Sequence, residues 1–149
     1  MSFWLQTALD MKFDFDDPQV HLADVGLALA RQCRFAGHCQ RHYSVAEHSL
    51  LMASRFSSPR MALHMLLHDA HEAFMGDITA PMKAWLAGQT NGSSTEAFDL
   101  LEGRINKVLY RDLGVPQPTV IEKKEIRTAD LRMLATEKRD LFTIDRAWP

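Results

Sequence analysis

Apolar residues recur every three or four positions along most of the chain, which is the spacing of one face of an α-helix. The pattern predicts a helix that Asp24 caps and that runs to about Arg34. A second helix is predicted from Ser44, which forms a capping box with Glu47, as far as Phe56. Both segments are expected to place their apolar faces against a core.

Residues 60–75 carry a broad apolar face and predict a single helix, for which Gly76 is a suitable terminus. Pro81 favours the first turn of a short helix that follows. The stretch 88–94, rich in glycine and serine, is predicted to be a flexible connection within one domain.

Two long helices are predicted in the C-terminal half. The first begins at a second capping box, formed by Ser93 and Glu96, and runs toward Gly114. The second spans about residues 119–142. Its inward face is expected to carry Ile126, Ala129, Met133 and Leu134.

Strand signals are weak, since only residues 13–16 (Phe-Asp-Phe-Asp) alternate as a short strand would, and Pro18 follows them. The pattern therefore predicts an all-α fold, a compact globule of five to seven helices. With 149 residues, the chain is expected to form a single domain over 1–149.

Charge and composition exclude several classes of protein. A net charge of −2 argues against a general nucleic-acid binder, which carries a basic excess. No apolar stretch is long enough to span a membrane, and no signal peptide is evident. The two cysteines, Cys33 and Cys39, are too few for a zinc knuckle. We expect a reduced, cytoplasmic protein that binds neither nucleic acid nor membranes.

The segment His68-Asp69-Ala70-His71-Glu72 is the strongest chemical signal. An adjacent His-Asp pair offers a neutral nitrogen ligand beside an anionic oxygen ligand. Glu72 lies one helical turn on, over the same face, where it can exchange protons. A metal with an acid/base carboxylate beside it is typical of a hydrolase.

All seven histidines lie in the first half of the chain, and none follows His71. This distribution favours one divalent ion over two, and the candidate ligands are His48, His68, Asp69 and Asp130. Two imidazoles and two carboxylates suit Co²⁺, Mn²⁺ or Zn²⁺ best, and also admit Mg²⁺, Ni²⁺ or Fe²⁺.

Each candidate ligand also has a simpler interpretation, as a packed histidine or a solvated helix carboxylate. The metal interpretation is preferred because one ion would explain all four residues together, including carboxylates on apolar helix faces that need a partner. His64 and His71 are left open between roles at the site and ordinary packing.

Other polar groups near these segments suggest a phosphorylated ligand. Asp77, after Gly76, is a candidate for orienting an attacking water. Arg34 and Lys83 are candidates for phosphate contact, because arginine in particular offers planar paired donors. His38 belongs to the same cationic group, whereas Arg41 and His42 fit a solvated loop better. Phe35 is equally consistent with stacking on a sugar or base and with core packing.

Together these residues resemble a known family. Ser44-Val45-Ala46-Glu47-His48, His68-Asp69-x-x-Glu72, Gly76-Asp77 and Ala129-Asp130 closely resemble HD-domain phosphohydrolases, in the branch of bacterial 5′-deoxynucleotidases and small phage dATP triphosphohydrolases. The resemblance covers about residues 22–140, and the stretch from Arg34 to His38 is most similar to the phage-type proteins.

The resemblance implies a role for each matching position. The four candidate ligands would hold the ion, while Glu72 and Asp77 would handle water and protons. Arg34 matches an arginine that contacts phosphate or deoxyribose, and Lys83 matches a position that faces phosphate. Phe35 stands where the deoxynucleotidase has tryptophan, so base and sugar selection is expected to differ. The implied reaction releases the nucleoside 5′-oxygen from phosphorus.

The leading expectation is a deoxynucleoside triphosphate triphosphohydrolase that prefers dATP and releases deoxynucleoside and triphosphate. The alternatives are a 5′-deoxynucleotidase acting on monophosphates and a non-catalytic HD-fold metal-binding regulator. A cyclic-dinucleotide phosphodiesterase and a di-iron oxygenase are disfavoured, because further histidines are missing. The resemblance also implies a homo-oligomer, in host cytoplasm if phage-encoded. The apolar termini, residues 3–5 and 147–148, are candidate interface segments.

Overall fold

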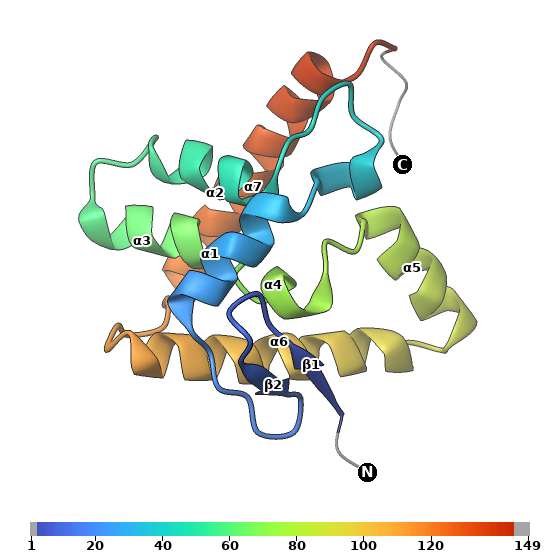
Figure 1. The fold of residues 1–149 in the computed structure, drawn as a ribbon. Coiled ribbons are helices and arrows are strands. Elements are labelled where there is room, and N and C mark those ends of the chain that lie inside the picture. The colour runs from blue at the N-terminus through green and yellow to red at the C-terminus, as the bar shows by residue number, and fades with distance from the viewer. Residues whose placement is uncertain (1–2, 145–149) are drawn as a thin grey trace.

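The computed structural model describes residues 3–144 and shows a mostly helical chain with a small β-hairpin at its edge (Figure 1). The all-α expectation is thus confirmed, and seven α-helices fall within the described range. The interface segment 147–148 lies outside the described residues. The elements are β1 Trp4–Gln6, β2 Lys12–Asp14, α1 Leu22–Arg31, a 3₁₀ turn Arg34–Gly37, α2 Val45–Ala53, α3 Pro59–Leu67, α4 Glu72–Met75, α5 Ala80–Gln89, α6 Ser93–Asp112 and α7 Val120–Leu141.

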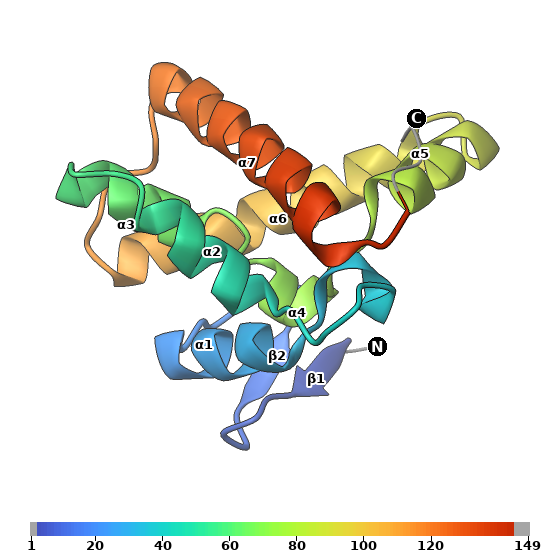
Figure 2. The ribbon, with the colours of Figure 1, turned by 90° about the horizontal axis from the view of Figure 1, so that it is seen from above.

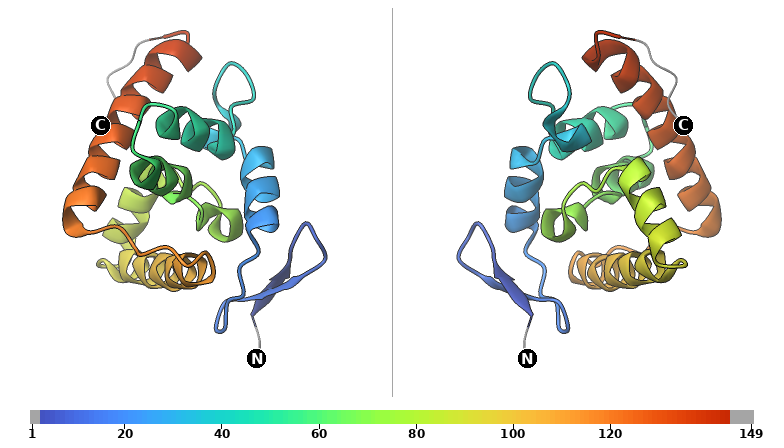
Figure 3. Two further views of the ribbon diagram at one scale, coloured as in Figure 1. Left: turned by 90° about the vertical axis from the view of Figure 1, so that its left-hand side faces the viewer. Right: turned by 90° about the vertical axis from the view of Figure 1, so that its right-hand side faces the viewer.

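The hairpin pairs β1 with β2 in antiparallel register and lies beside α1, away from α7 (Figure 3). Its inward residue Phe13 is fully buried and stacks on Phe74 of α4 with ring centroids 3.9 Å apart. The same core takes Leu29 from α1, Val45 from α2 and Ile105 from α6. The predicted strand near residue 13 is confirmed, although it ends at Asp14.

Asp24 does not cap α1, contrary to the prediction. It lies inside the first turn and is buried, while His21 occupies the N-cap position. Its carboxylate accepts hydrogen bonds from the backbone N–H of Leu9 at 2.8 Å and from the hydroxyl of Thr7 at 2.8 Å. Asp24 therefore ties the hairpin connection to α1, a long-range role that local sequence does not reveal.

The predicted helix over residues 60–75 is wrong as a single element. It is divided into α3 and α4 by a turn over residues 68–71. The bond from Ala70 N–H to Leu67 C=O, at 3.1 Å, is a tight three-residue closure that interrupts the α-helical ladder. Gly76 ends α4 with a φ of 83°, as predicted, because glycine adopts that region without strain.

The two predicted capping boxes are not formed as expected. Ser44 accepts from the Glu47 backbone N–H at 3.0 Å, but the Glu47 carboxylate pairs with Arg41 instead of returning to the helix start. At α6 the N-cap is Gly92, with a φ of 88°, and the Ser93 hydroxyl donates to a carbonyl in the preceding turn. The stretch 88–94 is largely taken up by the ends of α5 and α6.

Helix α7 packs across α2 and α3, while α6 runs in a different direction across the molecule and contacts α5 (Figure 2). The packing surface is a group of methionines, Met52, Met61 and Met65. Ile126, Ala129 and Met133 rest on it, as the helical pattern predicts. No helix of residues 3–144 combines the length and apolarity that crossing a membrane requires.

Candidate metal centre

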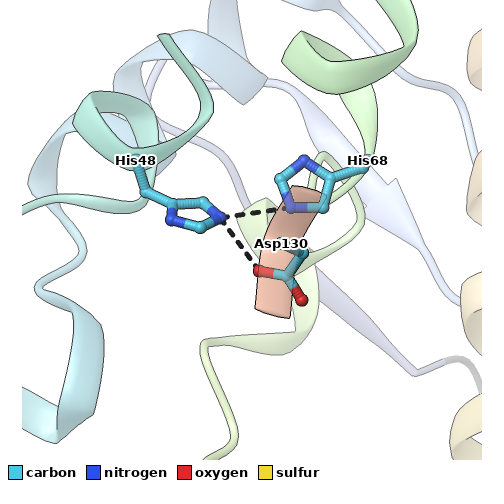
Figure 4. A group of neighbouring side chains, drawn as sticks. All are labelled: His48, His68 and Asp130. Atoms are coloured by element: carbon cyan, nitrogen blue, oxygen red, sulfur yellow. Dashed lines mark hydrogen bonds and ion pairs between the residues drawn. The ribbon is translucent and has the colours of Figure 1, made fainter. Parts of the chain in front are cut away.

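Three side chains from distant parts of the chain converge at one point (Figure 4). His48 comes from α2, His68 follows the end of α3, and Asp130 comes from α7. Nε2 of His48 lies 3.3 Å from Nε2 of His68 and 3.4 Å from Oδ1 of Asp130. One ligand atom from each residue lies within 4.8 Å of the other two, so the group can hold a metal ion.

Asp69, the fourth predicted ligand, lies at the same point. Its Oδ2 is 3.0 Å from Nε2 of His68 and 3.7 Å from Nε2 of His48. Burial alone would raise the pKa of Asp69, but the neighbouring imidazoles and Arg34 lower it below its usual range. The carboxylate is therefore ionised, with Arg34 Nη1 also 3.4 Å away.

Hydrogen bonds on the far sides of the two imidazoles fix which nitrogens carry protons. Nδ1 of His68 lies 2.7 Å from the Met65 carbonyl, which only accepts, so Nδ1 must donate. Nδ1 of His48 faces the Glu137 carboxylate at 2.5 Å and donates there. In neutral imidazoles both Nε2 atoms then carry lone pairs, and these are the atoms that face each other.

The point where these side chains converge is therefore surrounded by electron-pair donors. They are the Nε2 atoms of the two imidazoles and the carboxylates of Asp69 and Asp130. Such groups repel one another unless a positive charge lies among them. Burial opposes a positive charge on His48, but hydrogen bonds to Asp130 and Glu137 raise its pKa, so the surrounding carboxylates favour a positive charge at this point. A mixed nitrogen and oxygen set of this kind fits a divalent metal ion.

Glu137 is a central residue that the sequence analysis missed. It is 3% exposed, and its carboxylate meets Nδ1 of His48, the hydroxyl of Tyr43 at 2.8 Å and Nη2 of Arg34 at 3.3 Å. Burial favours the neutral acid, yet these donors lower its pKa. Glu137 stands in a run of charged residues (Glu-Lys-Arg-Asp, 137–140) typical of a solvated helix surface, so its spacing gave no signal.

The predicted phosphate contact Arg34 is buried and bonded to carboxylates. Its guanidinium lies within 3.4 Å of Asp69 and 3.3 Å of Glu137, although Nε has no partner among residues 3–144. Burial opposes the charge, but these carboxylates raise the pKa of Arg34 above its ordinary value. Arg34 therefore places a fixed positive charge directly behind Asp69 and Glu137.

The loop after Arg34 brings a predicted catalytic residue close. Phe35 adopts a left-handed φ of 57°, and its backbone N–H donates to Oδ2 of Asp77 at 3.1 Å. Its ring packs edge-on against Phe142, with centroids 5.2 Å apart, as a packing residue would. His38 is exposed on the following turn. Of these residues, Phe35 is the one that holds a candidate site residue, through its backbone bond to Asp77.

Glu72 and Asp77 both have environments that favour the protonated acid. Glu72 is buried, and its Oε2 has no hydrogen-bond partner within the described chain. Burial, followed by the charges of Asp69 and Asp77, raises the pKa of Glu72 to about 9. Burial also raises the pKa of Asp77, against the influence of Arg34. A carboxyl group with a displaced pKa beside a candidate metal centre is suited to proton transfer.

A cavity of about 490 Å³ opens beside the candidate metal ligands. His68, Asp69, Glu72 and Asp130 line it, together with residues of α5, α6 and α7. Lys83 lines the cavity, as its predicted role requires, whereas Arg34, Phe35 and His38 do not. A volume of this size falls within the range of small-molecule sites.

The two ambiguous histidines have different surroundings. His64 is fully buried, with Nδ1 3.2 Å from the hydroxyl of Tyr110, so it is a packing residue. His71 lines the cavity, and its Nε2 lies 3.6 Å from Glu102. Cys33 and Cys39 are free thiols with sulfur atoms 3.8 Å apart.

The structure is that of an all-α protein with a candidate metal centre. Its sequence is similar to two bacterial proteins. No protein-family profile matches the chain. It is 36% identical over 139 residues to the uncharacterized protein YfdR of Escherichia coli, covering 93% of this chain and 70% of YfdR. It is 30% identical over 140 residues to the uncharacterized protein RCAP_rcc00048 of Rhodobacter capsulatus, covering 85% of this chain and 67% of that protein. The chain belongs to the family of YfdR.

Proposed function

We propose that the protein is a metal-dependent phosphohydrolase of the HD-domain type that acts on deoxynucleotides. The observation that carries the proposal is the meeting of two imidazole lone pairs with ionised Asp69 and with Asp130, a set of acceptors that a divalent cation satisfies. His48, His68, Asp69 and Asp130 would hold the ion. Co²⁺, Mn²⁺ and Zn²⁺ are the preferred candidates for this donor set.

When bound, a divalent ion supplies positive charge against a phosphate oxygen and makes a nearby water more acidic. The chain's own residues divide the remaining work. Glu72, which lines the cavity and whose Oε2 has no hydrogen-bond partner among residues 3–144, exchanges a proton with the water or the leaving oxygen. Asp77, anchored by the Phe35 backbone, orients the attacking water. His68, His48 and Arg34 together keep Asp69 in its ionised form.

The preferred substrate is a deoxynucleoside triphosphate, dATP in particular, cleaved to deoxynucleoside and triphosphate. The choice of adenine follows from the resemblance to phage-type proteins, and the cavity volume of about 490 Å³ supports a ligand of nucleotide size. The second candidate is hydrolysis of deoxynucleoside monophosphates, since the same phosphorus–oxygen bond breaks in both reactions.

The decisive experiment incubates the purified protein with dATP or dAMP in the presence of Mn²⁺ or Co²⁺ and identifies the products. Deoxyadenosine and triphosphate from dATP are expected. Release of free phosphate from dAMP, with dATP left intact, would reject the triphosphohydrolase and favour the 5′-deoxynucleotidase.

A parallel measurement separates an enzyme from a metal-binding regulator. The Glu72→Gln variant should bind metal as the wild type does and lose hydrolysis by about 10²–10⁴-fold. If it retains every activity of the wild type, the catalytic role of Glu72 is wrong. If neither protein turns over any nucleotide although both bind metal, the regulator is favoured instead.

A further inference from the structure

One wall of the cavity is formed by a single stripe of α7. Lys123, Arg127 and Asp130 all line the cavity and are spaced four and three residues apart, which places them on one helix face. At 1.5 Å per residue, Arg127 lies about 4.5 Å and Lys123 about 10 Å along the helix axis from the candidate ligand Asp130. The stripe thus leads away from the metal centre and carries positive charge.

Neither cation has a carboxylate partner in the part of the chain that the structure describes. Among residues 3–144, no carboxylate oxygen within 4.0 Å pairs with Lys123 or Arg127. By contrast, Arg60 is bound to Glu122, in the first turn of α7, at 2.6 Å. Two unpaired cations beside a candidate metal centre are available to an anionic ligand.

The opposite charge lies on a different element. Asp99 and Glu102 of α6 line the same cavity, and Glu102 faces His71. These carboxylates repel phosphate, so an extended anion is directed toward the wall formed by α7. Lys83 of α5 lines the same cavity and adds a third positive charge to it.

We propose that Arg127 and Lys123 form a polyphosphate subsite, which holds the phosphates beyond the one placed at the metal centre. The proposal rests on the proposed hydrolase function, because the subsite would make triphosphates better substrates than monophosphates. The binding step itself is separable from turnover. Arg127, three residues from Asp130, contacts the second phosphate, and Lys123, one turn further, contacts the third.

The test compares two inorganic probes, orthophosphate and tripolyphosphate, at a constant free concentration of Mn²⁺. Their affinities are measured by calorimetry for the wild type and for the double variant Lys123→Gln/Arg127→Gln. A matched control is Lys124→Gln/Arg132→Gln, which removes two exposed cations of α7 that do not line the cavity. Hydrolysis of dATP and dAMP is measured for the same proteins.

The cavity variant should bind tripolyphosphate at least about tenfold more weakly, as expected for lost charge-assisted hydrogen bonds, and should bind orthophosphate normally. The control should bind both probes as the wild type does. Unchanged tripolyphosphate binding, or an equal loss for both probes, would overturn the subsite. If tripolyphosphate binding weakens as expected but no nucleotide is hydrolysed by any form, the subsite stands and the proposed function fails.

Discussion

Glu137 accepts a hydrogen bond from Nδ1 of His48 across 89 residues of sequence and so directs Nε2 of that ring at the candidate metal centre. A carboxylate behind a metal-binding histidine fixes its tautomer and makes it a stronger ligand. The same carboxylate also accepts hydrogen bonds from Arg34 and Tyr43. One residue of α7 therefore holds three side chains in place next to the candidate metal centre.

This relationship predicts the effect of Glu137→Gln. The amide oxygen can still accept from His48 but carries no charge, so Mn²⁺ affinity should fall about 10–100-fold. Isothermal titration calorimetry measures the change, with circular dichroism to verify the fold. The exposed Glu125→Gln on the same helix is the control and should bind metal normally. Equal affinities for the two variants would show that Glu137 has no role in positioning His48.

Metal binding is expected to stabilise the folded chain, because the ligands converge only after folding. At a free Mn²⁺ or Co²⁺ concentration 100 times the dissociation constant, stability should rise by about 2.7 kcal/mol, and EDTA should reverse it. Asp130→Asn should lose most of this increment in thermal melts. His42→Gln, in the exposed loop before α2, should keep it. An identical metal response in all three proteins would place the ion elsewhere.

The hairpin should contribute substantially to the stability of the fold through the buried aromatic ring of Phe13. Phe13 is fully buried against Phe74, and Phe13→Ala is expected to lower the free energy of unfolding by about 3–5 kcal/mol. Phe3 is 60% exposed, and Phe3→Ala should change it by no more than about 0.5 kcal/mol. Urea denaturation measures both, and similar small losses would mean that the hairpin is dispensable.

Acid should remove one electrostatic contribution at the start of α7. Hydrogen bonds from Arg60 and from the Thr119 backbone lower the pKa of Glu122 to about 2, from an ordinary value of 4.5. A lowered pKa stabilises the fold above pH 4.5, and that contribution disappears as the pH falls through about 2. Glutamine preserves the capping geometry without the charge.

The melting temperature of the wild type should therefore exceed that of Glu122→Gln at pH 7. The difference should shrink between pH 4.5 and about 2. Thermal melts of both proteins across this pH range measure the difference. A difference in melting temperature that does not change with pH would show that the charge of Glu122 is not its cause.

The local sequence pattern predicted most helices and their buried faces. The roles of several single residues depend instead on contacts between distant parts of the chain. The inward face of α7 and the terminus at Gly76 followed from helical spacing and from the conformational freedom of glycine. Asp24 resembled a helix cap in sequence, but its partners lie 15 and 17 residues away. Glu137 resembled a solvated residue because its partners come from α2 and the segments before it.

The site shows the same division. Adjacent ligand types and their spacing were sufficient to propose His48, His68, Asp69 and Asp130, which the fold brings close together. The cavity wall formed by α7 was not predictable, because its composition depends on how α6 and α7 are arranged. Arg34 was expected to face phosphate, and only the fold shows its two carboxylate partners.

The methionine surface beneath α7 has a consequence for ion selection. Met52, Met61 and Met65 support the helix that carries Asp130, and thioether side chains adjust to small displacements at low energetic cost. A helix seated on such side chains can move slightly toward or away from the two histidines. The centre should accordingly accept cations of unequal radius, with cellular supply rather than a rigid cage deciding which one is present.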